Sequence, residues 1–187
     1  SCQVDAAIEV PTMGDIYPTG TLAKVLRVVE IPNHHPTAIL QSFGRISLSP
    51  EPTRINPFLR THVSTLPEEL PEEDDAEFKA LFETFREATL QYIKLNENLG
   101  MEAFMAVQNI SNPIFFINFV ATNLPFDTEE KALLLEDGNM MSRTFSLLRI
   151  LQRELQFVKL KQKISERTRE ELDQQQKEYY LQHQIKN

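Results

Sequence analysis

Cysteine is scarce in this chain of 187 residues, because Cys2 is the only one. A single thiol cannot form an internal disulfide, and it cannot supply the several thiolates of a structural zinc site. Long apolar runs are also absent, and residues 1–10 lack the basic start and apolar middle of a secretion signal. These absences predict a globular, soluble protein of the reducing cytoplasm, without a membrane partner.

Glycine is also scarce and occurs only at positions 14, 20, 44, 100 and 138. A phosphate-binding loop needs clustered glycines followed by Lys and Ser or Thr, and no such run occurs. No serine lies in a glycine-flanked turn. We therefore expect neither a cofactor site nor a catalytic residue in this chain. No motif supports a stand-alone hydrolase. His34 and His35 are adjacent in a turn, far in sequence from His62 and His183, so no metal site is predicted.

The charges are unevenly distributed along the chain. Residues 1–66 carry five acids and five bases, residues 67–137 carry 16 acids and four bases, and residues 138–187 carry ten bases and six acids. The overall net charge of −8 would repel phosphate, and the basic final block mixes its bases with acids. Nucleic acid is therefore a disfavoured partner. We divide the chain at these changes in composition.

The first block, residues 1–66, has the pattern of β-strands. Residues 21–31 and 37–41 are rich in aliphatic and β-branched side chains and flank the turn-like run PNHHP, which predicts a hairpin. Residues 44–48 and 58–66 are two further candidate strands. We expect a small antiparallel β subdomain whose opening strands are missing.

An acidic linker at residues 67–75 precedes a helical subdomain at residues 76–138. Its first helix is amphipathic and should end at Gly100, with apolar side chains at Phe78, Leu81, Phe82, Phe85, Tyr92, Leu95 and Leu99. A second short helix follows over residues 101–110. A third has Asn112 as its cap and is apolar nearly all round, which predicts that it is buried. A capping box of Asp127 and Glu130 should start the fourth.

Residues 139–187 should form one very long helix, because neither proline nor glycine interrupts them. The 48 residues from 139 to 186 would form a helix roughly 72 Å long. Its first half carries an apolar seam at Phe145, Leu148, Leu151, Leu155, Val158 and Ile164. Its second half is polar between residues 165 and 177 apart from Leu172, with Arg167 and Glu171 paired four residues apart. This half needs a partner outside its own domain to be stable.

Three stretches, QKEYYLQHQIKN, YIKLNENL and the run from Gly20 to Leu48, together resemble the N-terminal domain of the ATP-dependent Lon proteases of bacteria and organelles. The resemblance covers residues 16–187, although His34 and Ser42 stand where the family often has glycine and His183 replaces an acidic residue. It implies an α+β fold: a PUA-like β subdomain, then a helical bundle ending in a very long protruding C-terminal helix. In the family this helix leads into an AAA+ module, which binds ATP and Mg²⁺, and a Ser-Lys protease domain.

The resemblance implies two roles for this non-catalytic region of an ATP-dependent serine endopeptidase. One is to engage unfolded or damaged polypeptides, and the other is to support assembly of a homohexamer. Neighbouring subunits would meet through sparse apolar residues of the long helix, namely Leu172, Tyr179, Tyr180 and Ile185. The alternative is a stand-alone PUA-like adaptor that binds a ligand or RNA and dimerises through its helix. RNA binding would require a basic sheet with aromatic side chains, whereas residues 1–66 are neutral with few aromatics.

Overall fold

The structure is a computed structural model that describes residues 1–30, 36–96 and 98–185, with side chains described up to residue 182. The chain forms two compact units, each assembled from separate segments. The first unit contains residues 1–73 and 121–143, and the second contains residues 74–120 and 144–187.

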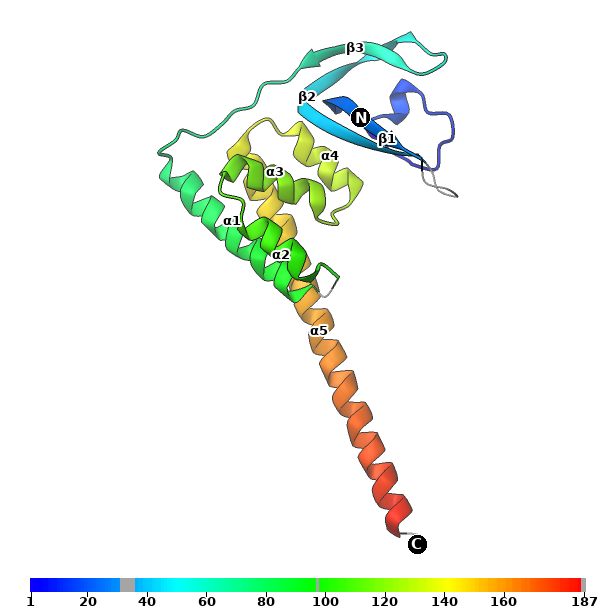
Figure 1. Ribbon diagram of the computed structural model, residues 1–187, viewed down its shortest axis with the longest axis vertical. Helices are drawn as coiled ribbons and strands as arrows, with labels where there is room; N and C mark the ends of the chain where they lie inside the picture. Colours follow the sequence, from blue (N-terminus) through cyan, green and yellow to red (C-terminus); the bar gives the residue numbers. More distant parts are fainter. Residues whose placement is uncertain (31–35, 97, 186–187) are drawn as a thin grey trace. The chain divides into compact units, whose positions relative to one another are not determined.

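The first unit carries an antiparallel sheet of three strands in the order β1-β2-β3. These are β1 (Thr19–Val29), β2 (Thr37–Arg54) and β3 (Arg60–Thr65), and the 3-10 helix η1 (Met13–Asp15) precedes them (Figure 1). The expected hairpin is confirmed by the pairing of Thr19 with Ser47 and of Val29 with Thr37. The expected turn at residues 32–36, including His34 and His35, lies mostly outside the described residues.

The prediction of separate strands at residues 37–41 and 44–48 was wrong, because both belong to the single strand β2. The β1–β2 register shifts where Leu22 pairs with Gly44 and Ala23 pairs with Ser42, which leaves Phe43 as an extra residue. A β-bulge of this kind absorbs one residue without ending the strand. The glycine at position 44 therefore marks a bulge and not a turn.

A cluster of three charged side chains joins the sheet to the rest of the first unit. Arg45 on β2 and Arg143 near the start of α5 (Met140–Ile185) both contact the carboxylate of Glu68. Arg45 also donates to the carbonyl oxygens of Pro67 at 2.6 Å and of Leu135 at 2.9 Å, near the end of α4 (Thr128–Glu136). Both arginines are buried. We call Arg45, Glu68 and Arg143 the arginine cluster.

Gly138 is required by the close packing of this cluster. A Cβ atom at this position would lie 2.7 Å from Nη2 of Arg45 and 3.3 Å from the carbonyl oxygen of Pro67. Because hydrogen bonds fix the Arg45 guanidinium on several sides, the side chain has no room to move away. The glycine between α4 and α5 is therefore needed because a side chain would not fit beside Arg45.

The capping box predicted at the start of α4 was wrong at Asp127. The side chain of Asp127 makes no capping hydrogen bond, although its carbonyl oxygen accepts from the backbone N–H of Lys131 at 3.0 Å. Asp127 is exposed, so water already satisfies its carboxylate and a cap bond gains little. Helix α4 lies against β1, and the core of this unit lies around Ile46, Leu124, Phe126, Leu134 and Met140.

The second unit is helical and contains α1 (Ala76–Leu95), α2 (Gly100–Gln108), most of α3 (Pro113–Asn123) and α5 from residue 144 onward. Asp75 caps α1, since its carboxylate accepts from the backbone N–H of Phe78 at 2.9 Å. The buried face of α1 is the predicted one, although Leu95 and Leu99 are only half-buried. The helix ends at Leu95 and not at Gly100, because a turn begins at Asn96.

Helix α3 confirms its predicted cap but not its predicted burial. The carboxamide of Asn112 accepts from the backbone N–H of Phe115 at 2.8 Å. Phe116 packs edge-on against Phe82 and Phe85 of α1, with ring centroids 5.4 Å and 5.8 Å apart. Phe115, one residue earlier, is exposed. Successive side chains point about 100° apart on a helix, and only one side of α3 packs on a neighbour.

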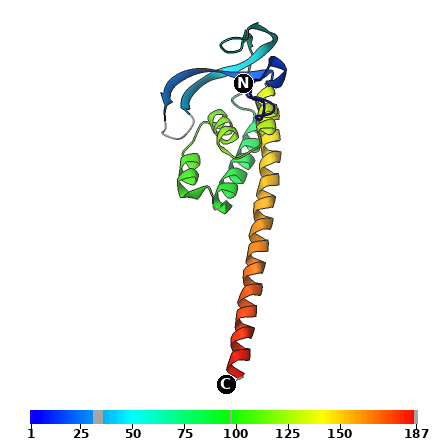
Figure 2. The same cartoon turned by 90° about the vertical axis from the view of Figure 1, so that its right-hand side faces the viewer.

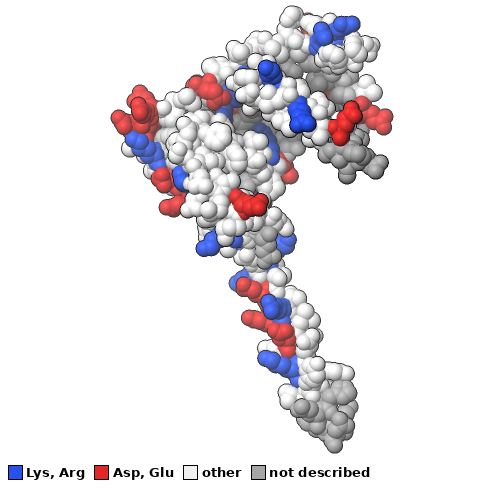
Figure 3. All heavy atoms as spheres, viewed as in Figure 1, with Lys and Arg blue, Asp and Glu red and all other residues white. Residues whose placement is uncertain are grey.

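Helix α5 begins one residue after its predicted start and continues to residue 185, the last described residue. In both Figure 1 and Figure 2, α1 lies beside the first part of α5, and the remainder of α5 extends past the other helices of its unit. The predicted seam was partly wrong, because Phe145 and Ile164 are exposed. The buried seam consists of Thr144, Leu147, Leu148, Leu151 and Leu155. Acidic and basic side chains cover much of the outer part of α5 (Figure 3).

Candidate functional site

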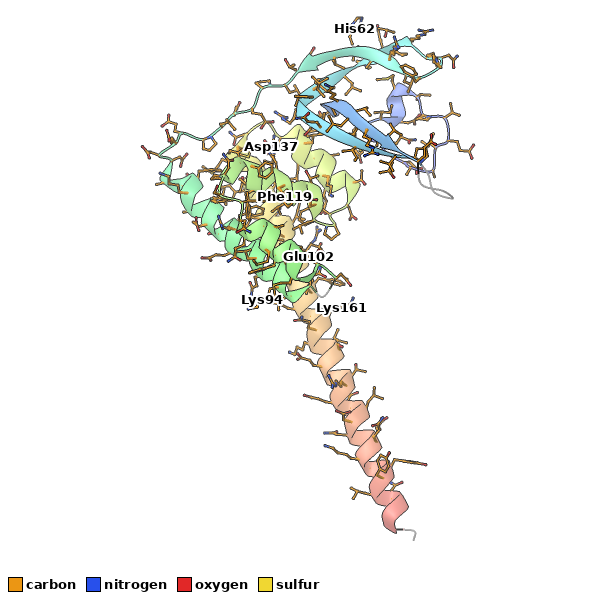
Figure 4. The ribbon with its side chains drawn as sticks, viewed as in Figure 1. His62, Lys94, Glu102, Phe119, Asp137 and Lys161 are labelled. Atoms are coloured by element: carbon orange, nitrogen blue, oxygen red, sulfur yellow. The ribbon has the colours of Figure 1, made fainter. Side chains whose placement is uncertain are left out.

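A pocket of about 400 Å³ lies where α1 turns into α2. Its lining residues are Ile93, Lys94, Asn96, Gly100, Met101 and Phe104. Lys94 at the end of α1 and Glu102 on α2 are labelled in Figure 4 and show the location of this turn. Pockets of this size that are mainly apolar hold one or two bulky apolar side chains.

The turn between α1 and α2 is built by asparagine and glycine. The backbone N–H of Asn96 donates to the carbonyl oxygen of Tyr92 at 3.0 Å, and the Asn96 side chain accepts from the N–H of Asn98 at 3.1 Å. Such side-chain bonds compete with the helix and end it. Gly100 has φ of +57°, which disfavours any residue with a Cβ. The helix therefore stops five residues before the glycine predicted to end it.

Hydrogen bonds hold the end of α1, next to the pocket. The side-chain N–H of Gln162 on α5 donates to the carbonyl oxygen of Leu95 at 3.0 Å, and so fixes the end of α1. Asn96 donates from Nδ2 to the Tyr92 hydroxyl at 3.1 Å. Tyr92 and Ile93 are both buried, and burial raises the pKa of the Tyr92 hydroxyl, with the nearby Glu154 carboxylate acting in the same direction. The end of α1 beside the pocket is thus anchored by hydrogen bonds and by the burial of Ile93, which lines the pocket.

Two apolar side chains of α2, Met101 and Phe104, line the pocket, and Met105 follows them on the same helix. Met101 is 73% exposed and Met105 is 51% exposed, and Phe104 between them is half-buried. Positions 101, 104 and 105 lie on one face of the helix. Methionine is unbranched and flexible, so it adapts to ligands of different shape. We call Met101, Phe104 and Met105 the α2 face.

The described lining of the pocket is mainly apolar. Among the described residues that line it, there is no histidine, cysteine, serine or carboxylate. Elsewhere, His62 is exposed on β3 (Figure 4), and among the described residues no three metal-binding side chains lie together. What the pocket offers is an apolar recess beside one lysine.

The residues predicted from sequence lie elsewhere, on the outer part of α5. Leu172, Tyr179 and Tyr180 are exposed, while Ile185 is the last residue of the helix and its side chain is outside the described part. Tyr179 lies 17 residues beyond Gln162, or about 25 Å along the helix axis. The pocket and the predicted residues are thus two separate places in one unit.

Four exposed apolar residues form a stripe along α5. Phe157, Ile164, Leu172 and Tyr179 follow one another at separations of 7, 8 and 7 residues, and all are exposed. With 3.6 residues per turn they fall within an arc of about 80°. Tyr180 points about 100° away from Tyr179 and lies off this line. We call these four residues the α5 stripe.

Sequence reasoning missed the α2 face. The signal was present, because Met101, Phe104 and Met105 recur at helical spacing in a segment directly after a glycine. What the pattern could not show is that this face remains uncovered. A short apolar helix is usually covered by its neighbours, and exposure depends on the position of every other helix.

Comparisons with known proteins place this chain in a family. The family model of the ATP-dependent protease La (LON) substrate-binding domain matches residues 1–153. The chain belongs to this Lon substrate-binding domain family. The Lon protease of Porphyromonas gingivalis is 39% identical over 186 residues, which is 98% of this chain and 22% of the relative. That of Parabacteroides distasonis is 37% identical over 185 residues, with coverages of 99% and 22%. The resemblance found in the sequence is confirmed.

A solved structure supports the fold of the Lon domain. The N-terminal domain of Mycobacterium avium complex Lon protease matches with a TM-score of 0.58 at 21% identity, over 74% of this chain and 70% of the other. The α+β fold with a long final helix is confirmed. The chain spans about a fifth of the length of its curated relatives. Across the described residues, no helix is long and apolar enough to cross a membrane.

Proposed function

We propose that the α1–α2 pocket and the α2 face bind apolar side chains of unfolded or damaged polypeptides, as the client grip of an ATP-dependent Lon serine endopeptidase. The observation that supports this most directly is the pocket beside exposed methionines in a chain matched by a substrate-binding family. Unfolded chains expose apolar side chains that folded proteins bury. A flexible apolar face accepts many such side chains without requiring one sequence.

The size of the pocket predicts weak binding by one chain. Burying one Leu or Phe side chain contributes about 1.5–3 kcal/mol, and association itself costs several kcal/mol. A single grip is therefore expected to be weak, no tighter than the millimolar range, which corresponds to about −4 kcal/mol. Several copies on one assembly would convert weak grips into useful avidity. Weak contacts also allow a client to be released for threading.

Light scattering and fluorescence anisotropy test the grip directly. We expect this chain to bind labelled, reduced and alkylated lysozyme, and not disulfide-intact lysozyme. Phe104→Ser should weaken binding at least about fivefold, because it replaces an apolar lining residue by a polar one. Phe119→Ser is the matched control, since Phe119 is also half-buried but does not line the pocket. Equal losses in both variants would refute a grip at this pocket.

A second role, assembly of a homohexamer, is supported by the α5 stripe. Exposed apolar residues along a helix that extends past its unit suit contact with another copy of that helix. Tyr180 and Ile185 would contribute at the outer end. In the complete protease, Tyr179→Ser with Tyr180→Ser should reduce the molar mass and the turnover of clients. A normal hexamer with normal turnover in this double variant would rule out the contact.

The parent protease would supply the energy for degradation. ATP and Mg²⁺ would act in an ATPase module of the parent protease, and no residue of this chain is assigned to them. The lone Cys2 suits a cytoplasmic enzyme that keeps its thiols reduced.

A further inference from the structure

The methionines of this chain differ sharply in exposure. There are five, at positions 13, 101, 105, 140 and 141. Met140 is fully buried, and Met13 and Met141 are half-buried. The two exposed ones, Met101 and Met105, both belong to the α2 face, one helical turn apart. Solvent oxidants therefore reach the thioethers of the α2 face first.

Oxidation would change the chemistry of this face without changing its size much. A hydroperoxide transfers one oxygen atom to the methionine sulfur, its O–O bond breaks, and it leaves as water or an alcohol. The sulfur loses two electrons and the peroxide gains them, with no other reactant needed. The product, methionine sulfoxide, is polar and strongly hydrated. An apolar client side chain gains less from contact with a hydrated sulfoxide than with a thioether.

We propose that Met101 and Met105 form an oxidation-sensitive switch, at which hydroperoxides lower the affinity of the α1–α2 pocket for apolar polypeptide segments. The inference rests on the proposed client grip. Met101 lines the pocket and Met105 extends the same face by one turn. Because sulfoxide reductases reverse this modification, the switch is reversible. Leucine at these positions would keep the face apolar and unable to respond.

The site of oxidation is tested by mass spectrometry. The variant used for this test is Cys2→Ser, because the exposed thiol of Cys2 would also react with peroxide. After limited treatment with hydrogen peroxide, peptide mapping should find sulfoxide first at Met101 and Met105 and last at Met140. Equal or faster oxidation of the buried Met140 would overturn the assignment.

The effect on binding is tested by the ratio of affinities before and after peroxide, with reduced and alkylated lysozyme as the client. We expect about a tenfold loss in the Cys2→Ser protein, restored by methionine sulfoxide reductases. In the same background, Met101→Leu with Met105→Leu should show no change on treatment, whatever its starting affinity. Met13→Leu with Met141→Leu is the matched control and should remain sensitive.

The outcomes separate the two proposals. If untreated protein fails to bind the unfolded client, the client grip itself is refuted, and the switch with it. If binding is normal but survives full oxidation of Met101 and Met105, only the switch is refuted. The switch also fails if the leucine double variant loses affinity on treatment as strongly as its parent.

Discussion

The arginine cluster holds two positive charges against one carboxylate. Arg45 and Arg143 are both buried, while the Glu68 side chain is one-third exposed. Buried guanidinium groups are tolerated only when their charge is compensated and their N–H groups are bonded. The carbonyl oxygens at the end of α4 supply part of this compensation, because helix C-termini carry partial negative charge. Glu68 supplies the rest.

Replacing Glu68 by Gln should lower the free energy of unfolding by about 3 kcal/mol, the lower end of the range for breaking a buried pair. The lower end applies because solvent partly screens Glu68. The measurement is urea denaturation followed by circular dichroism. Glu72→Gln is the control, since Glu72 is exposed in the same linker, and it should change stability by less than about 0.5 kcal/mol. Indistinguishable midpoints for the two variants would contradict the role assigned to Glu68.

Tyr92 should give the protein an alkaline limit. Burial raises the pKa of its hydroxyl above the ordinary value of 10.0. In the unfolded chain the hydroxyl ionises at its ordinary pKa, so its contribution to stability is complete below about pH 10 and is lost as pH rises through the raised pKa. Denaturation midpoints against pH should fall in that window. Tyr92→Phe should flatten the fall, and an unchanged profile would exclude Tyr92 as its source.

At the scale of elements, α1 and α4 begin in different ways although both follow an aspartate. Asp75 makes its capping bond to α1, and Asp127 makes none to α4. Asp75→Ala should therefore cost about 1 kcal/mol, and Asp127→Ala only a few tenths through the helix dipole. Chemical denaturation of the two variants measures the difference. A larger loss at Asp127 would show that local sequence, and not the observed bond, sets the energy of the cap.

Helix α5 changes character after Leu155. Up to that residue its seam is buried, and from residue 156 to residue 182 no described side chain is fully buried. Ion pairs such as Arg167 with Glu171, 3.1 Å apart, contribute only about 0.3–0.5 kcal/mol each.

Amide exchange should therefore differ between the two parts of α5. A helix without packing opens locally at little free-energy cost. We expect exchange in residues 165–182 to be at least about a hundredfold faster than in residues 144–155. Hydrogen exchange read by mass spectrometry measures this on the isolated chain. Equal protection in both parts would mean that the outer part already has a partner, such as a second copy.

At the scale of the whole molecule, the client grip and the α5 stripe occupy different places and should fail independently. Phe104→Ser should weaken client binding and leave the molar mass of the complete protease unchanged. Leu172→Ser with Tyr179→Ser should lower that mass, and should leave the client affinity of the single chain unchanged. Light scattering and anisotropy measure the two properties. If each variant damaged both properties, grip and assembly would share one surface.

The sequence by itself determined the features that depend on neighbours along the chain. The uninterrupted α5, the amphipathic α1, the Asn112 cap and the β1–β2 hairpin follow from propensity, periodicity and local hydrogen bonds, and the family followed from matching stretches. Tertiary structure alone decided the rest. Arg45, Glu68 and Arg143 are separated by 23 and 75 residues, and only folding brings their charges together. The same holds for the α2 face, because exposure is set by what other elements leave uncovered, and no local pattern encodes that.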